Sequence, residues 1–517
     1  MTLIARFLAV IAALFGGALA LADEPEKSRV NILVVTVDDM NWNSVGAFGS
    51  PIADITPHID ALARNGRRFE RAYVTASNCS PSRVALMTGR YPQETGATGF
   101  FYVDDKNTPT IAGELRRNGY LTGIINKVSD TNPAPDSRKY WDVFANLGAA
   151  AKYSPGQIGK ASAGFFARAR SEARPFYLMV NIADPHKPNF NDPEAAKSGA
   201  DAHTPSRIIA PNEVAVPAFL PDLPGIRSDL RNYTNSVKRA DDALGAIMAS
   251  LRASGLEEDT LVIFLSDHGM PFPFAKSSVY DNSLRTPLVM QWKGRIAPGS
   301  VETGLVSTVD LMPTILDAAR IAMPNGPAYP GRSLVAAAPT AAPTHVFGSF
   351  DENARGYPVP MRAAIGQEWL YVFNAWSDGQ YAVKNDDMNH ASFKHMVKSA
   401  PRDPATKARL DYYLAPPVEE LCHLKVDPDC LVNRAGDPAH ADVLEAMRGA
   451  MRAQMVRTDD YLLEAFDLRG DQAGQRAFML RQLEAAQARA GLLQWKRPEN
   501  IAGRTGRNRE LFEKPVR

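Results

Sequence analysis

The stretch Val30-Asn31-Ile32-Leu33-Val34-Val35-Thr36-Val37, followed directly by Asp38-Asp39, predicts how this chain folds. A run of apolar and β-branched residues without alternation is typical of a parallel strand buried on both faces. The carboxyl ends of such strands are where open α/β sheets place ligands. Two adjacent carboxylates there repel each other unless a cation lies between them, so the stretch also predicts an oxygen-ligand metal site.

The same pattern recurs four times along the chain. Predicted strands at 69–75, 120–126, 176–183 and 260–266 lead into Cys79, Lys127, Asp184-Pro185-His186 and Asp267-His268, and Lys276 follows in the loop beyond the last. Helical patterns at 56–64, opened by a capping threonine, and at 110–118 and 227–253 lie between the strands. Strands that alternate with helices imply a parallel sheet with helices on both faces. We therefore expect the five polar strand ends to share one crevice.

The length of 517 residues exceeds what one hydrophobic core normally supports. From about residue 343 short strand-like runs appear at 345–349, 362–365 and 369–373, then a proline- and charge-rich loop at 398–417 and a helix at 437–457. We expect an α/β fold, with a large mostly parallel sheet sandwiched by helices and a smaller C-terminal α+β domain that carries a short antiparallel sheet. The predicted parts are a catalytic domain at 23–343, the smaller domain at 344–465 and a helical tail at 466–517, with an amphipathic helix at 474–490.

Residues 1–22 read as a secretory signal peptide. Arg6 precedes an apolar run from Phe7 to Leu21, which ends in small residues before Asp23. A membrane anchor is the alternative, but the run is shorter than the roughly 20 apolar residues needed to span a bilayer. We expect cleavage after Ala22, with Ala20 as the alternative position, and a periplasmic or secreted protein without a membrane anchor. The net charge of +1 provides no basic field for nucleic acid.

Export changes how the three cysteines are interpreted. Cys422 and Cys430 lie eight residues apart across a turn-like stretch, so they form a disulfide in an oxidising compartment or remain two thiols. Either way Cys79 is the odd cysteine. A free cysteine is usually a buried and inert core residue, which is the structural alternative at this position.

Cys79-Ser80-Pro81-Ser82-Arg83, continued to Gly89-Arg90, predicts a cysteine at the start of a helix. Pro81 suits the first helical turn, where its missing N–H costs nothing. A group at position 79 then faces the free N–H groups and the positive end of the helix dipole, which together form an anion site. Arg83 adds a planar fork of donors that suits a tetrahedral oxyanion. These residues point to chemistry on sulfate or phosphate.

Residues 79–89 resemble the signature of the sulfatase family, C-x-P-S-R followed by x-x-x-(L/M)-T-G. The resemblance implies that a separate maturation enzyme oxidises Cys79 to formylglycine, whose hydrated aldehyde is the nucleophile, and that one divalent cation is bound. Three further stretches, 266–273, 309–316 and 420–428, are similar to the heparan N-sulfatase (sulfamidase) group within that family. The implied substrate is a sulfated carbohydrate, such as a glycosaminoglycan fragment, carrying an O-sulfate ester or an N-sulfamate.

The resemblance also implies a role for each polar strand end. The implied metal ligands are Asp38, Asp39, Asp267, His268 and modified Cys79. The implied catalytic residues besides Cys79 are Arg83, Lys127 and Lys276, which would neutralise the sulfate oxygens, and His186, which would hydrogen-bond the sulfate or protonate the leaving group. Calcium is the expected cation, but a histidine in the position where many calcium sulfatases have asparagine makes manganese an alternative.

One residue departs from the family pattern. The family usually shows Gly-Lys-x-His where this chain has Asn126-Lys127-Val128-Ser129, and a serine cannot act as a base near neutral pH. Asp130 is the nearest titratable group. Ser129 leaves open a catalytically silent carbohydrate-binding homologue. A second alternative is a phosphonate monoester or phosphodiester hydrolase of the same superfamily, which shares the formylglycine and often an Asp-His metal pair such as Asp267-His268.

Overall fold

The structure is a computed structural model that describes residues 29–100, 107–132, 137–338, 340–378, 381 and 383–492. In the described part of the chain the larger sheet has eight strands in the order β4-β3-β5-β1-β6-β7-β2-β8. Their bounds are β1 (Asn31–Val37), β2 (Arg67–Tyr73), β3 (Leu121–Ile125), β4 (Val143–Ala145), β5 (Phe176–Ile182), β6 (Thr260–Ser266), β7 (Arg285–Gln291) and β8 (Ser300–Ser307).

Strand β1 lies near the centre of this sheet, and all seven of its residues are buried. It pairs in parallel with β5 on one side and with β6 on the other. Among the described strands of this larger sheet, only β7 is antiparallel to its neighbours, β6 and β2. The mostly parallel sheet is confirmed, and the five strands predicted from the sequence lie within two residues of their predicted bounds.

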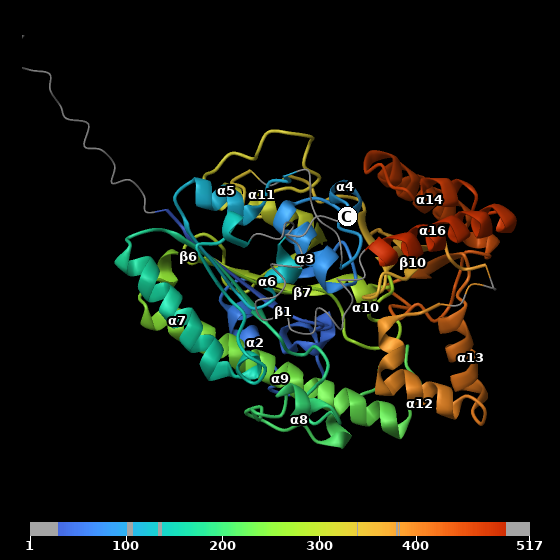
Figure 1. Cartoon of the computed structure of the whole chain (residues 1–517), viewed down its shortest axis with the longest axis horizontal. Helices are drawn as coiled ribbons and strands as arrows, with labels where there is room; N and C mark the ends of the chain where they lie inside the picture. The colour runs from blue at the N-terminus through green and yellow to red at the C-terminus, as the bar shows by residue number, and fades with distance from the viewer. Residues whose placement is uncertain are drawn as a thin grey trace, which may run out of the picture.

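Helices cover both faces of the sheet (Figure 1). Leu33 and Val35 of β1 point into a core with α2 (Pro57–Arg64), α7 (Pro155–Ser171) and α9 (Pro224–Ala253). Ile32 and Val34 point into the opposite core with α3 (Cys79–Thr88), α5 (Ile111–Arg117) and α11 (Leu311–Ala318). Four short helices lie in the connections: α4 (Pro92–Thr95), α6 (Val128–Thr131), α8 (Ala195–Ser198) and α10 (Asp281–Leu284).

The smaller sheet is antiparallel, as predicted, with the order β12-β11-β10-β9. Its strands are β9 (Val346–Glu352), β10 (Pro358–Ile365), β11 (Trp369–Asn374) and β12 (Glu419–His423), and the last helices are α14 (Ala441–Arg457), α15 (Leu463–Asp467) and α16 (Gln472–Leu492). A parallel bridge from Ala76 to Ser349 joins it to the larger sheet. Tyr280 also crosses the boundary, since its hydroxyl donates to Glu420 at 2.9 Å. Cys422 and Cys430 form a disulfide.

One prediction in this region is wrong. The stretch 398–417, predicted as a loop, begins at the end of α12 (Ala391–Ser399) and contains α13 (Pro404–Leu414). The physical reason is a regular helix start: the Asp403 side chain accepts a hydrogen bond from Ala405 N at 3.1 Å, and Pro404 occupies the first turn. The many proline and charged residues of this stretch were interpreted as a loop, and the helix start at Asp403-Pro404 was missed.

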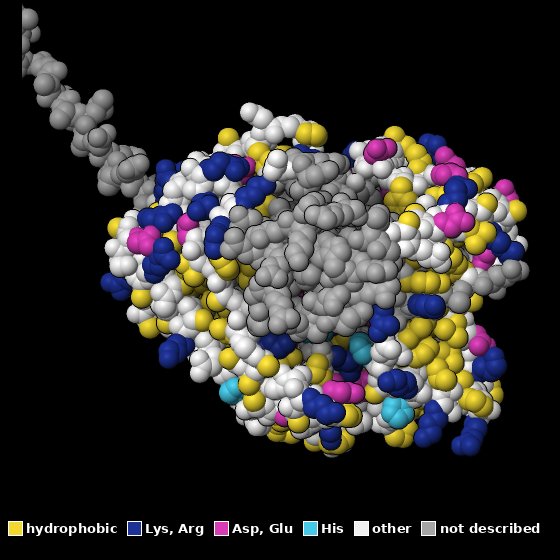
Figure 2. Space-filling model, viewed as in Figure 1, with side chains coloured by type: hydrophobic (Ala, Val, Ile, Leu, Met, Phe, Trp, Pro, Cys, Tyr) yellow, Lys and Arg dark blue, Asp and Glu magenta, His cyan; other side chains and the backbone are white. Residues whose placement is uncertain are grey.

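The predicted signal peptide at 1–22 and the basic end from residue 496 lie outside the described residues. No helix within the described ranges has both the length and the apolar composition needed to cross a membrane. On the face seen in Figure 2, Lys and Arg side chains lie among Asp and Glu side chains.

The start of α2 is capped from a distant helix rather than by the predicted threonine. Thr56 makes no side-chain capping bond to this helix. Instead Asp241 of α9, which is fully buried, accepts hydrogen bonds from the backbone N–H groups of His58 and Ile59, both at 2.9 Å. A carboxylate at this point satisfies two free donors and interacts favourably with the helix dipole.

We predict that Asp241→Ala lowers the free energy of unfolding by about 1–2 kcal/mol, because two N–H groups at a helix start lose their acceptor. Urea denaturation followed by circular dichroism measures the loss. Asp241→Asn keeps an oxygen acceptor at the same position and should lose less. Equal stability of the alanine variant and the original chain would show that this cap contributes nothing.

Candidate active site

The five predicted strand ends meet at one edge of the larger sheet. Asp38 and Asp39 follow β1, and Cys79 is the first residue of α3, as its sequence context predicts. The Cys79 Sγ atom lies 3.4 Å from Asp38 Oδ1 and 3.5 Å from His268 Nε2. Residues more than 180 positions apart in the chain therefore face the same helix start.

Three overlapping groups of side chains at this edge have the spacing of a metal site. The ligand atoms of each group lie within 4.8 Å of one another, and the groups are Asp38, Asp39 and Asp267; Asp39, Cys79 and His268; and Asp38, Cys79 and His186. All of these side chains except that of His186 are fully buried. Carboxylates packed this closely away from water repel strongly unless a cation neutralises them. The donor set of carboxylate oxygens and one imidazole fits a divalent ion.

The orientation of His268 supports the same interpretation. Its Nδ1 lies 3.1 Å from the carbonyl oxygen of Gly269, to which it donates. In the neutral ring Nε2 then carries a lone pair, and that atom lies 3.2 Å from Asp39 Oδ1. Two electron-rich atoms facing each other are stabilised by a shared cation, and a carbonyl that fixes the tautomer is a common support of metal-binding histidines.

Two lysines contact the carboxylates from the outer side of the site. Lys127 Nζ lies 2.6 Å from Asp38 Oδ2, and Lys276 Nζ lies 2.7 and 2.8 Å from the two oxygens of Asp39. Burial raises the pKa of both carboxyl groups and is the largest single effect, but the nearby positive groups together outweigh it, with Lys127 foremost beside Asp38 and Lys276 beside Asp39, and each pKa lies below its usual range. For Asp267 burial outweighs its partners and raises the pKa. In the absence of a bound cation these carboxyl groups differ in acidity.

Arg83 lies beneath the carboxylates and is fully buried. Its Nη2 and Nε donate to Asp267 Oδ2 at 2.8 and 3.1 Å, and Nη2 also lies 3.5 Å from Asp38 Oδ1. Its Nη1 donates to Asn181 Oδ1 at 2.6 Å and to Thr36 Oγ1 at 2.8 Å. The guanidinium therefore orients two carboxylates and is occupied by them, which is a different placement from the sulfate contact that the family resemblance implies.

Asn181 is a site residue that the sequence reasoning missed. It lies within β5, is fully buried, and donates through Nδ2 to the carbonyl groups of Ile125 and Asn126. Asn126 and Lys127 both have positive φ, at 60° and 51°, in a turn that directs Lys127 toward Asp38. Asn181 thus connects Arg83 to the turn that carries Lys127. The available signal was a polar residue inside an otherwise apolar strand, Phe176-Tyr177-Leu178-Met179-Val180-Asn181-Ile182.

Two further titratable side chains, His186 and Asp130, lie beside Cys79 and Lys127 respectively. Burial lowers the pKa of His186 to about 4, so its ring is neutral near pH 7. Its Nδ1 donates to the carbonyl oxygen of Lys187, which leaves the Nε2 lone pair free to accept a proton. The Asp130 carboxylate lies 3.2 Å from Lys127 Nζ. Ser129, where the family usually has histidine, lies on α6 between Lys127 and Asp130 in the sequence.

The thiol of Cys79 is itself a poor nucleophile in this setting. Burial and the adjacent Asp38 raise its pKa well above the usual range, so the thiolate is scarce at neutral pH. A cysteine that serves as a thiol nucleophile needs the opposite environment. The surroundings of Cys79 therefore suit a group that differs from a free thiol.

The comparisons with known proteins agree with this geometry. The family model described as Sulfatase matches residues 30–321. Human N-sulphoglucosamine sulphohydrolase is 30% identical over 474 residues, which cover 83% of this chain and 90% of that protein. A solved 2-O GAG sulfatase has a TM-score of 0.62 at 19% identity and covers 84% of this chain and 93% of its own.

A phosphonate monoester hydrolase of Agrobacterium radiobacter has a similar fold, with a TM-score of 0.61 at 18% identity, and covers 83% of this chain and 96% of its own. At this low sequence identity the similarity supports a shared fold and nothing about function. The family match extends over more than half of the present chain and includes the strand ends described above. The chain therefore belongs to the sulfatase family.

Proposed function

We propose that this protein is an exported sulfatase that hydrolyses sulfate esters or N-sulfamates of sulfated sugars with Cys79 converted to formylglycine. The observation that carries the proposal is the position of Cys79, at the first turn of α3 and within 3.5 Å of both Asp38 and His268. The helix start supplies free N–H groups for an oxyanion, and the neighbouring carboxylates supply the ligands for a cation.

Asp38, Asp39, Asp267, His268 and the modified Cys79 side chain would hold one divalent cation, with calcium as the first choice and manganese as the second. When bound, that ion polarises a sulfate oxygen and favours the ionised form of the hydrated aldehyde. Arg83 holds Asp267 through hydrogen bonds and Asp38 through an ion pair. We assign it the role of orienting these two ligands.

Lys127 and Lys276 are suited to bind the sulfate. Lys127 contacts Asp38 and Lys276 contacts Asp39, and both charges act on the Cys79 side chain, so a sulfate bound at Cys79 lies close to both ammonium groups. Their buried charges stabilise negative charge more strongly than exposed lysines do. The neutral His186 can accept a proton through Nε2 beside Cys79, and we assign it the role of the base that the family histidine has where this chain has Ser129. Asp130 is less available for that role because it is paired with Lys127.

The sugar class rests on the human relative, whose name states that it acts on N-sulphoglucosamine. We propose N-sulfated or O-sulfated glucosamine residues of glycosaminoglycan fragments as substrates, a maturation enzyme that modifies Cys79, and a periplasmic or secreted location. A panel of N-sulfoglucosamine and O-sulfated monosaccharides, assayed by sulfate release with calcium and then with manganese, tests the proposal. Absence of sulfate release from the whole panel by matured protein would refute it.

A phosphonate or phosphodiester hydrolase is the second candidate, and Asp267-His268 is the observation that favours it, because an imidazole ligand suits a transition ion. Turnover of an aryl sulfate and of the matching aryl phosphonate separates the two. Faster cleavage of the phosphonate would overturn the sulfatase proposal.

We predict that the peptide containing Cys79, from protein produced together with a formylglycine-generating enzyme, carries an aldehyde in place of the thiol. Mass spectrometry of that peptide measures the fraction converted. Activity should scale with this fraction across preparations, and Cys79→Ala should have none. Full activity of preparations that contain only the thiol would contradict the nucleophile assignment.

We predict that a chelator abolishes activity and also lowers the thermal unfolding midpoint, because the clustered carboxylates repel once the cation is removed. Calcium or manganese should restore both. Asp267→Asn serves as the matched variant, since it removes one charge from the cluster and should show a smaller response to added metal. An unchanged midpoint in chelator would show that the buried acids need no ion.

We predict that Asn181→Ala reduces kcat/KM by about 10- to 100-fold, the size of effect typical of residues that support metal ligands. The physical reason is loss of the acceptor that holds Arg83 and of the donor that holds the turn at Lys127. Asn325→Ala, which changes an exposed loop, provides the control. Metal affinity measured by titration should fall together with the rate; a variant with unchanged rate and unchanged affinity would remove Asn181 from the site.

A further inference from the structure

A large cavity lies at the opposite end of the main sheet from Cys79. Its volume is about 1170 Å³, and its wall includes Val30 just before β1, Arg67 at the start of β2 and Trp292 just after β7. Because β1 is seven residues long, roughly 20 Å of sheet separates this cavity from the strand ends that carry Asp38 and Cys79. A molecule in the cavity therefore contacts a different surface from the one used in hydrolysis.

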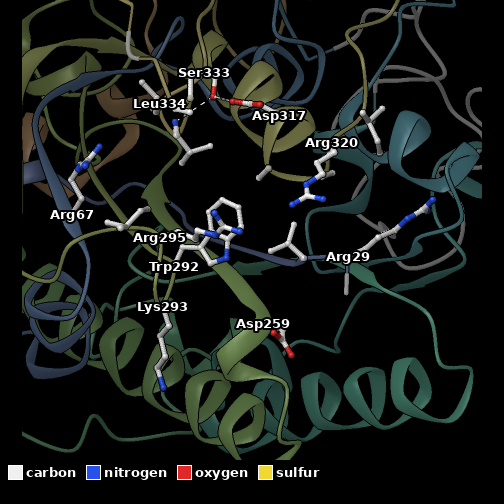
Figure 3. A pocket seen from close by; sticks show the side chains of 18 of the residues that line it. Arg29, Arg67, Asp259, Trp292, Lys293, Arg295, Asp317, Arg320, Ser333 and Leu334 are labelled. Carbon is white, nitrogen blue, oxygen red and sulfur yellow. Dashed lines mark hydrogen bonds between the residues drawn. The ribbon is translucent and has the colours of Figure 1, made fainter. Parts of the chain in front are cut away.

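Cationic side chains surround this cavity on several sides (Figure 3). They are Arg29, Arg67, Lys293, Arg295, Arg320 and Arg332. Cationic groups that lie around one volume repel one another and gain energy from an anion placed between them. Their planar forks match the oxygens of sulfate and carboxylate groups.

The acidic residues of the wall neutralise only part of this charge. Glu258 is bound by Lys293, and Asp317 accepts from Ser333 Oγ at 2.5 Å. Glu302 accepts from Gly304 N at 2.9 Å, and Asp259 is the remaining acid of the wall. The arginines on the opposite sides of the cavity are not paired with these carboxylates.

The arginines instead contact neutral groups or leave donors free. Arg29 donates to the carbonyl of Asn118 at 2.6 Å, and Arg67 donates to Ser300 Oγ at 3.3 Å. Arg332 Nε is buried and has no hydrogen-bond partner among the described residues. Within the same described ranges, Arg295 and Arg320 form no ion pair with a carboxylate, and Figure 3 shows both directed toward the middle of the cavity. The wall thus keeps several donors available to a ligand.

Trp292 adds an aromatic surface between these charges. Its ring is half-buried, and the Arg295 guanidinium lies 5.8 Å from the ring centroid. An indole beside guanidinium groups provides an apolar face for the C–H side of a sugar ring together with donors for its anionic substituents. This combination distinguishes the cavity from a site for a simple inorganic anion.

We propose that this cavity is a second, non-catalytic binding site for a sulfated oligosaccharide. The inference rests on the proposed function, since it assumes that the substrate is a sulfated sugar chain. The cavity holds one part of the chain while a distant part enters the catalytic edge, on the same molecule or on another, and such bivalent attachment increases avidity without a new catalytic contact.

The test measures binding of a size-defined, highly sulfated glucosamine–uronate oligosaccharide to full-length Cys79→Ala protein by isothermal titration calorimetry. The double variant Arg295→Ala/Arg320→Ala should lose one class of binding sites or bind about tenfold more weakly, because two charge-assisted contacts disappear. Arg168→Ala/Arg170→Ala removes the same charge from the exposed side of α7 and should bind like the parent. Equal affinity of the Arg295/Arg320 variant and the parent would overturn the proposal.

Two further arms separate the possible sources of an effect. Inorganic sulfate at the concentration of the oligosaccharide should not displace it; displacement would mean a general anion site and would overturn the assignment to a sugar. In the matured, active enzyme the Arg295→Ala/Arg320→Ala change should raise KM for long chains and leave the turnover of a sulfated monosaccharide unchanged. A loss of monosaccharide turnover would refute an independent site. Failure of the proposed function appears separately, as absence of hydrolysis by the original chain.

Discussion

Repulsion among the buried carboxylates of Asp38, Asp39 and Asp267 is the interaction on which the rest of the site depends. These groups share a volume in which ligand atoms lie within 4.8 Å of one another, away from water. Lys127, Lys276 and Arg83 each contact at least one of them and so offset part of the repulsion. The carboxylate oxygens that face one another still form a close cluster of hard donors, which suits a divalent cation.

The same charge requirement explains the polar layer beneath the site. Arg83 is fully buried, and a buried guanidinium is stable only when its donors are satisfied. Asp267, Thr36 and Asn181 accept hydrogen bonds from these donors. Asn181 also donates to the carbonyl oxygen of Asn126, in the turn that carries Lys127. The position of Lys127, which we propose binds sulfate, is thereby connected to the position of the proposed metal ligands.

Local pattern predicted much of the fold and most of the site, for identifiable reasons. Buried parallel strands have a strong signal, so the strand ends at Asp38, Lys127 and Asp267 were predictable from sequence. Asn181 was not, because its partners lie on β1, α3 and β3, and only the folded sheet brings them together. The cap of α2 by Asp241 was missed for the same reason, since 183 positions separate it from His58. The direction of β7 could not be predicted, because its local sequence does not distinguish an antiparallel strand from a parallel one.

The burial of Cys79 has a consequence for the order of events in the cell. Only 3% of this residue is exposed, and every residue of α3 around it is buried as well. An enzyme that modifies the thiol cannot insert its own catalytic groups into a packed helix start of this kind. The proposed conversion of Cys79 is therefore expected to precede tertiary packing, while the segment is still an accessible peptide.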